Sequence, residues 1–486
     1  MGERSEKKEA EGSNKKIALM IAVAVILIGA AAVALFWRNR ESDPAKDALA
    51  SSENGDGDAD ATQGAMEPGE ESDASQDSQD AEEESDDAQD AAYIESVFVK
   101  YKEVVTPSVG EVGIPYFIVD FQDVKYTDAL ASKEELEEWL FTGTRSFADY
   151  YSISSHGRLQ LSGDVYFYTA SGDMASYETG EALEQLVMEM LDSFEDEVDF
   201  SKYDKNGDEV IDALMLSVPK GGDPGFWWGA THTWYANPDY TVDGLYLVKY
   251  VVNDDQPYQE SKKYFLNTVE HEFGHCLGLP DYYKYEYTGS DFEGMHGMAG
   301  KERMDDSEGD FCQFSKLLLG WLTEEQVQIM PSDVEEAEFF LPPVKDGGCL
   351  LIFPKDQEPN FQGEYFVVEY NTQEGLWAGV IEHRGIRVLH AQAELLDYDG
   401  GYFDFKYGNF SEYYDTSNEG IRVLKLVRDG RTFFREDSTI TYENTGGEKG
   451  NFGWYTEDGS ITEPGFHIEV GKIQEDGTIQ VKVLWD

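Results

Sequence analysis

The most informative stretch of this sequence for predicting the fold is His271-Glu-Phe-Gly-His-Cys-Leu-Gly-Leu-Pro-Asp281. His271 and His275 are four residues apart, so on a helix both imidazoles leave the same face about one turn apart. Two nitrogen ligands placed in this way can hold one zinc ion, with Glu272 beside the open coordination position. Gly278 falls where a helix commonly ends in a left-handed residue, and the following proline cannot continue the helix. The chain then turns back, which can carry Asp281 to the metal as a third ligand.

The full pattern H-E-x-x-H-x-x-G-x-x-D is the metzincin layout with aspartate in place of the usual third histidine. H-E-x-x-H alone occurs by chance in many proteins, but the downstream glycine and ligand make chance much less probable. The alternatives are a helix with two idle histidines and, for Asp281, a helix cap or a calcium contact. Metzincins also place a methionine in a turn beneath the metal. Met295, Met298 and Met304 are candidates, and position alone does not choose among them.

The composition is strongly acidic, with 37 basic and 98 acidic residues among 486 and a formal net charge of −61. Such a chain repels nucleic acid, so we expect no nucleic-acid partner. The charge suits a soluble secreted or surface protein that can hold divalent cations. Three cysteines are too few for a disulfide framework. Cys276 is most simply a small buried apolar residue, and the spacing does not show whether Cys312 pairs with Cys349.

The N-terminal part of the sequence predicts a membrane anchor. Residues 17–37 form an uncharged apolar run that is long enough to cross a bilayer as one helix. Basic residues before this run outnumber those just after it, which places residues 1–16 in the cytoplasm and the catalytic domain outside the cell. The alternative is a cleaved signal peptide and a secreted product.

Residues 38–92 are predicted to be an acidic, disordered linker. Between residues 41 and 92 there are 19 acidic residues and a single lysine. A segment with this composition cannot collapse onto a core, so it extends by self-repulsion and holds the following domain away from the membrane.

The remaining sequence predicts an α+β fold in two parts, a catalytic domain at 93–325 and a β-sandwich domain at 326–486. The catalytic part alternates predicted strands and helices, at 114–121, 132–139, 146–156, 159–168, 181–194, 211–218, 245–252 and 316–321. Asn267 and Glu270 form a cap pair that predicts the start of the zinc helix. The second part has short alternating strands, for example at 364–370, 385–390 and 479–484, separated by Gly, Asn and Asp turns.

An acidic loop at 204–212 predicts a calcium site. Asp204, Asn206, Asp208 and Asp212 bring several hard oxygens into one tight loop, as calcium requires. The loop is not a full EF-hand, because Glu209 stands where the consensus has glycine. An ordinary Asx-rich turn is the alternative. His232 can line the cleft, although no spacing supports ligation and a structural role is the simpler interpretation.

The segment 271–283 resembles the immune inhibitor A family of secreted bacterial metalloproteases, whose hallmark reads much like H-E-F-G-H-x-L-G-L-P-D-x-Y. Further similar segments lie at 119–121, 199–204 and 315–321. The resemblance implies that His271, His275 and Asp281 bind zinc and that Glu272 is the general base. It also implies that Met304 occupies the methionine turn.

Together these features predict a zinc-dependent endopeptidase that hydrolyses proteins or peptides outside the cell through a zinc-activated water. A zinc exopeptidase is a second enzymatic interpretation. The non-enzymatic alternative is an anchored adhesin or binding protein with a vestigial protease domain. The intact Glu272 argues against it, because a vestigial site has no need of a base. The sequence says nothing about the oligomeric state.

Overall fold

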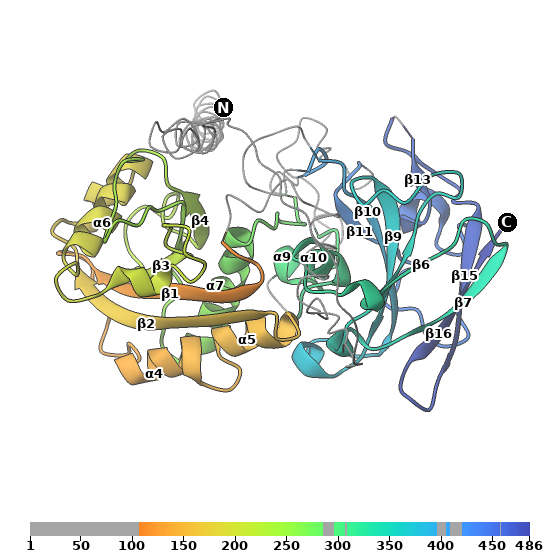
Figure 1. Ribbon diagram of the computed structural model, residues 1–486, viewed down its shortest axis with the longest axis horizontal. Helices are drawn as coiled ribbons and strands as arrows, with labels where there is room; N and C mark the ends of the chain where they lie inside the picture. The colour runs from red at the N-terminus through yellow and green to blue at the C-terminus, as the bar shows by residue number, and fades with distance from the viewer. Residues whose placement is uncertain (1–105, 285–295, 307–308, 396–404, 409–419, 457) are drawn as a thin grey trace, which may run out of the picture.

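The computed structural model describes residues 106–284, 296–306, 309–395, 405–408, 420–456 and 458–486 (Figure 1). The predicted membrane span, the predicted acidic linker and Met295 lie outside these residues. Within the described ranges, no helix has both the length and the apolar character needed to cross a membrane.

The first half of the described chain is built on a five-stranded sheet with the order β2-β1-β3-β5-β4. Four strands are parallel and β4, at one edge, is antiparallel to β5. The strands are β1 (Gly110–Asp120), β2 (Leu159–Thr169), β3 (Leu214–Ser217), β4 (Ala230–Thr233) and β5 (Lys249–Asn253). β1, β3 and β5 are buried almost throughout, as expected for parallel strands covered on both faces. The predicted strands in these regions are confirmed.

Helices cover both faces of this sheet. The side chains of β1 accordingly alternate between two hydrophobic clusters, one on each face. Ile114 and Tyr116 point to a cluster that includes α4, α5 and α7, whereas Phe117 and Val119 point to a cluster that includes α6. The helices are α4 (Lys133–Glu137), α5 (Phe147–Ser154), α6 (Gly180–Asp192) and α7 (Lys262–Cys276). Figure 1 shows α6 on one side of the sheet and α4 and α5 on the other. α4 lies in the stretch predicted as a helix at 132–139, and a capping box of Ser132 and Glu135 starts it.

The predicted start of the zinc helix is wrong. α7 begins at Lys262, after a short turn of 3₁₀ helix, so Asn267 lies inside the helix. Glu270 does not cap it, because its carboxylate forms a buried ion pair 2.8 Å from Arg303 Nη2. The Asn267–Glu270 spacing thus resembles a helix cap, although Glu270 binds Arg303, which lies 33 residues further along the chain. The predicted helix end is confirmed, with Gly278 in the left-handed region at φ 95°.

The second half consists of two facing sheets, as the sequence predicted. Their orders are β11-β10-β9-β8-β6 and β12-β15-β16-β7, and side chains from both sheets form one hydrophobic cluster between them. The strands of the first sheet are β6 (Val327–Ile329), β8 (Cys349–Ile352), β9 (Glu364–Asn371), β10 (Gly385–Gln392) and β11 (Leu424–Leu426). Those of the second are β7 (Glu336–Leu341), β12 (Thr439–Ile440), β15 (Phe466–Ile473) and β16 (Ile479–Trp485), and a separate hairpin is formed by β13 (Trp454–Tyr455) and β14 (Ile461–Thr462).

The two halves share a hydrophobic core. The outer face of the β6–β11 sheet belongs to the same cluster as α5, α7 and α10 (Gln313–Leu318), and Figure 1 shows α10 with α9 (Arg303–Asp306) between the halves. A buried ion pair between Glu369 and Arg387 reinforces this contact, because Glu369 accepts a hydrogen bond from the Gln313 amide at 2.8 Å. The described chain is thus a mixed α+β protein, as predicted. Its three cysteines are buried and unbridged, so Cys312 and Cys349 do not pair.

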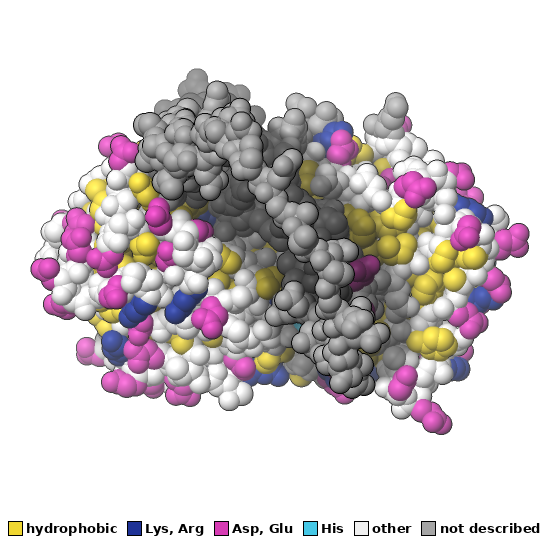
Figure 2. Space-filling model, in the orientation of Figure 1, with side chains coloured by type: hydrophobic (Ala, Val, Ile, Leu, Met, Phe, Trp, Pro, Cys, Tyr) yellow, Lys and Arg dark blue, Asp and Glu magenta, His cyan; other side chains and the backbone are white. Residues whose placement is uncertain are grey.

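The described surface is acidic, in keeping with the composition. On the face shown in Figure 2, Asp and Glu side chains are spread over both halves and outnumber those of Lys and Arg.

Candidate metal centre

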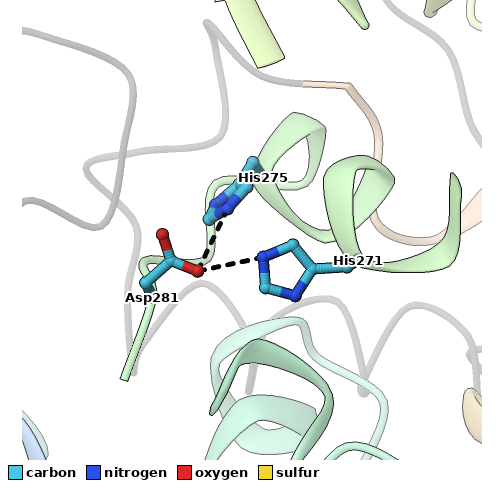
Figure 3. Close-up of side chains that lie close together, drawn as sticks. All are labelled: His271, His275 and Asp281. Atoms are coloured by element: carbon cyan, nitrogen blue, oxygen red, sulfur yellow. Dashed lines mark ion pairs between the residues drawn. The ribbon is translucent and has the colours of Figure 1, made fainter. Parts of the chain in front are cut away.

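The structure brings the three predicted zinc ligands together. His271 and His275 leave α7 on the same face, and the chain turns back after Gly278 so that the Asp281 carboxylate faces both rings (Figure 3). Asp281 Oδ1 lies 3.0 Å from His271 Nε2 and 3.3 Å from His275 Nε2. The side chains are 7%, 20% and 3% exposed for His271, His275 and Asp281, so only His275 has appreciable contact with solvent.

Both imidazoles are fixed in orientation through their second nitrogen. His271 Nδ1 lies 2.8 Å from the carbonyl oxygen of Arg303, and His275 Nδ1 lies 2.8 Å from that of Leu279. A carbonyl oxygen only accepts, so Nδ1 of each ring carries a hydrogen, and in the neutral ring it is Nε2 that has the lone pair a metal needs. Such a contact is typical of metal-binding histidines, because it selects the tautomer and holds the ring in place.

The geometry of these residues fits a zinc ion. Tetrahedral zinc with ligands at its usual distances requires ligand atoms roughly 3.4 Å apart, close to the two distances found around Asp281 Oδ1. Two imidazole nitrogens and one carboxylate oxygen are a common donor set for catalytic zinc. Burial by itself raises the pKa of Asp281, but the two imidazoles hold it well below its usual range, so this ligand is charged. The ligand atoms of these three residues all lie within 4.8 Å of one another, and no other three His, Cys, Asp or Glu residues in the described part of the chain do so.

Glu272 lies where a general base is needed. It is buried on α7 next to His271, and both residues line one pocket of about 460 Å³. Thr231 of the edge strand β4 positions it, since its hydroxyl donates to the Glu272 carbonyl at 2.7 Å and lies 3.5 Å from Oε2. Burial raises the pKa of Glu272, which favours a carboxylate able to accept a proton. Gly229 packs closely against the same helix, because a Cβ there would lie only 2.5 Å from the methyl group of Thr268.

Comparisons with known proteins do not assign the chain to a family. No protein-family model matches the sequence, and no curated protein matches it. One similar solved structure is a catalytically inactive OgpA from Akkermansia muciniphila in complex with an O-glycopeptide substrate, glycodrosocin. It shares 12% sequence identity over 61% of this chain and 94% of that chain, with a TM-score of 0.26. At this TM-score the similarity assigns neither a fold nor an activity to the chain.

Of the candidate methionines that the structure describes, Met304 packs against the helix that carries the two histidines. It is fully buried, and a Cβ added to Gly274 would lie 2.6 Å from its sulfur. Gly274 therefore allows the thioether to contact α7 between the two histidines. The Met304 carbonyl also accepts a hydrogen bond from the Tyr282 amide at 2.9 Å, which ties this turn to the segment that carries Asp281.

The predicted calcium loop is closed by its own hydrogen bonds. The carboxylate of Asp204 accepts from three backbone amides that follow it, and Asp208 accepts from one further along. Asn206 lies 2.9 Å from Asp208 Oδ2, and the buried Asp212 accepts from the Gly113 amide at 2.7 Å. Burial raises the pKa of Asp212 to about 7. These contacts are those of an Asx-rich turn, and calcium at the four residues stays a prediction.

The pocket also contains residues that the sequence did not single out. Tyr283 and His296 lie on adjacent segments, with ring centroids 6.1 Å apart, and both line the pocket together with Trp228 and Thr268. Tyr283 matches the final tyrosine of the hallmark, which was the available signal. His296 has no such signal, because the fold brings it back to the site from beyond a stretch that lies outside the described residues. His232 does not line this pocket, and it stacks on Tyr250 at 5.1 Å.

Proposed function

We propose that this protein is a zinc-dependent endopeptidase that acts on extracellular proteins or peptides. The observation that carries the proposal is the convergence of His271, His275 and Asp281 within zinc-binding distance, with Glu272 on the wall of the same pocket. A vestigial site has no need of a buried, positioned base beside three well-oriented ligands.

Each residue has a definite part in hydrolysis. His271, His275 and Asp281 would hold the metal in the orientation that their backbone contacts fix. Zinc bound there would polarise the scissile carbonyl and make water a nucleophile near neutral pH. Glu272 would take the proton of the attacking water and pass it to the leaving amine.

The edge strand β4 offers a place for the substrate backbone. In the described residues β4 pairs with β5 on one side only, and it lies beside Glu272 through Thr231. An extended peptide can add to such an edge through main-chain hydrogen bonds, which would lay a peptide bond across the pocket.

We also propose that the site is of the metzincin type, as the resemblance to the immune inhibitor A family implies. The placement of Met304 against Gly274 supports a methionine turn under the metal. The apolar run at 17–37 supports a location at the cell surface, with a secreted form as the alternative.

The experiment that tests the function is cleavage of casein by the wild type and by Glu272→Ala, each purified with zinc. We expect Glu272→Ala to bind zinc like the wild type and to lose at least about 100-fold in cleavage rate, because general base catalysis contributes that much or more. Glu260→Ala, which removes an exposed carboxylate near the start of α7, serves as the control and should cleave normally. Fragment masses distinguish internal cleavage from trimming of the ends. Full activity in Glu272→Ala would reject the assignment.

A further inference from the structure

The pocket that contains His271 and Glu272 has an acidic wall for which the proposed chemistry has no use. Asp254 and Asp255 follow directly after β5 and Asp305 belongs to α9, and all three line the pocket. Among the described residues that line it, none is Lys or Arg. The wall therefore presents negative charge without a matching positive charge in the lining.

Asp254 and Asp255 are placed to receive a cation. Asp255 Oδ2 accepts a hydrogen bond from the Thr268 hydroxyl at 2.6 Å, and its other oxygen is 3.7 Å from Nζ of Lys220, whose side chain is 62% exposed. Burial raises the pKa of Asp254, and the neighbouring Asp255 raises it further. A positive charge entering the pocket would offset both contributions.

Asp305 supplies an independent sign of a missing partner. Its Oδ2 accepts hydrogen bonds from the amides of Met298 and Gly300 at 3.2 and 2.7 Å. Its Oδ1 is buried and accepts no hydrogen bond from the described residues. His296 Nδ1 lies 3.5 Å from Asp305 Oδ1, but its hydrogen bond is with the backbone carbonyl oxygen of Asp305 at 2.7 Å. A buried carboxylate oxygen without a donor is costly, so a ligand that brings an N–H donor would be favoured there.

The pocket also has an aromatic wall. Trp228 lines it and is 50% exposed, an unusual state for so large a side chain. An indole face can pack against an aliphatic chain and attract a cation. A bare metal ion would make no use of this wall, whereas a long basic side chain would use both the indole and the carboxylates.

We propose that this pocket binds the side chain of a lysine or arginine of the substrate, adjacent to the bond that is cleaved. The proposal rests on the proposed function, because it places a peptide across His271 and Glu272. The stem of the basic residue packs on Trp228, and its cationic end lies among Asp254, Asp255 and Asp305.

The first test is the cleavage preference of the purified protein. In casein digests, we expect one fixed position next to the cut to be occupied mainly by Lys or Arg. With two peptides that differ only in Lys or norleucine at that position, kcat/KM should be about 10-fold to 100-fold higher for Lys, the usual strength of a hydrogen bond to a charged group. In Asp254→Asn this ratio should fall, because one of the three carboxylates loses its charge, and in Asp254→Lys it should fall further. Glu335→Gln removes an exposed carboxylate before β7 and should keep the wild-type ratio.

A second test measures binding without turnover. The dissociation constants of the same two peptides, fluorescently labelled, are measured by anisotropy with the Glu272→Ala protein. The Lys peptide should bind about 10-fold to 100-fold more tightly than the norleucine peptide. This difference in affinity should shrink when Asp254→Asn is added. Lys-selective binding without cleavage by the wild type would reject the peptidase function and leave the basic-residue pocket standing. Cleavage with equal rates and equal binding for both peptides would overturn the pocket. A Lys preference of unchanged size in Asp254→Asn would overturn it as well.

Discussion

Glu302 shows how single residues hold the turn beneath the histidine pair. It is completely buried, and its carboxylate accepts hydrogen bonds from the amides of Met304 and Cys312 and from the hydroxyl of Ser315. These contacts connect the Met304 turn to the start of α10. Arg303 lies in this turn, and its backbone carbonyl accepts a hydrogen bond from His271 Nδ1. The position of His271, a proposed zinc ligand, therefore depends on the same turn.

The burial of Glu302 predicts a pH dependence of stability. Burial raises its pKa from 4.5 to about 7, while the hydrogen bonds it accepts oppose the rise. Between these pH values the folded protein binds more protons at Glu302 than the unfolded chain does, so this residue stabilises the fold less as pH rises. We expect the free energy of unfolding of the wild type, minus that of Glu302→Gln, to fall as pH rises from about 4.5 to about 7 and then to level off. Urea unfolding at a series of pH values measures it.

The subtraction cancels every titration that the two proteins share, including those of the histidines. Glu335→Gln, which alters an exposed carboxylate, provides the comparison and should show no such trend. A difference for Glu302→Gln that stays constant over this range would contradict the assignment of a raised pKa.

At the scale of elements, the bounds of helices and strands were predicted best where neighbouring residues alone set them. The apolar run in β1 and the capping box of α4 are examples, since each is set by neighbouring residues. The end of α7 follows the same rule, because the left-handed Gly278 and the proline after it stop any helix. Spacing alone also placed His271 and His275 on one face of a helix.

The elements that were misjudged or missed depend on contacts between distant segments. Glu270 imitates a cap, but its carboxylate is bound by Arg303. Spacing did not distinguish Met304 from the other candidate methionines, and only the family resemblance indicated it, because its contact with Gly274 joins distant segments. Asp254 and His296 come to the pocket from a strand end and from a later loop, and neither position has a repeating spacing that identifies it.

At the scale of the whole molecule, the shared core has a consequence for the proposed boundary between residues 325 and 326. Phe314 of α10 packs against Tyr365 and Phe405 of the second half, with ring centroids 6.3 and 6.1 Å apart. The buried Arg387 donates to the carbonyl of Lys301 in the first half. A cut at this boundary would expose an apolar face on both pieces.

We therefore expect the two halves to unfold together. A fragment of residues 93–325 should lack a cooperative urea transition and should not cleave casein, whereas residues 93–486 should show one transition that coincides by fluorescence and circular dichroism. A 93–325 fragment that is soluble, cooperative and active would show that the halves are independent.

The most direct test of the central claim is the position of zinc in crystals of the protein, determined from anomalous scattering at the zinc absorption edge. We predict one strong peak about 2 Å from His271 Nε2, His275 Nε2 and Asp281 Oδ1, and its loss in His271→Ala. Crystals of protein purified with zinc that show no peak among these three atoms, or a peak held by other residues, would contradict the account.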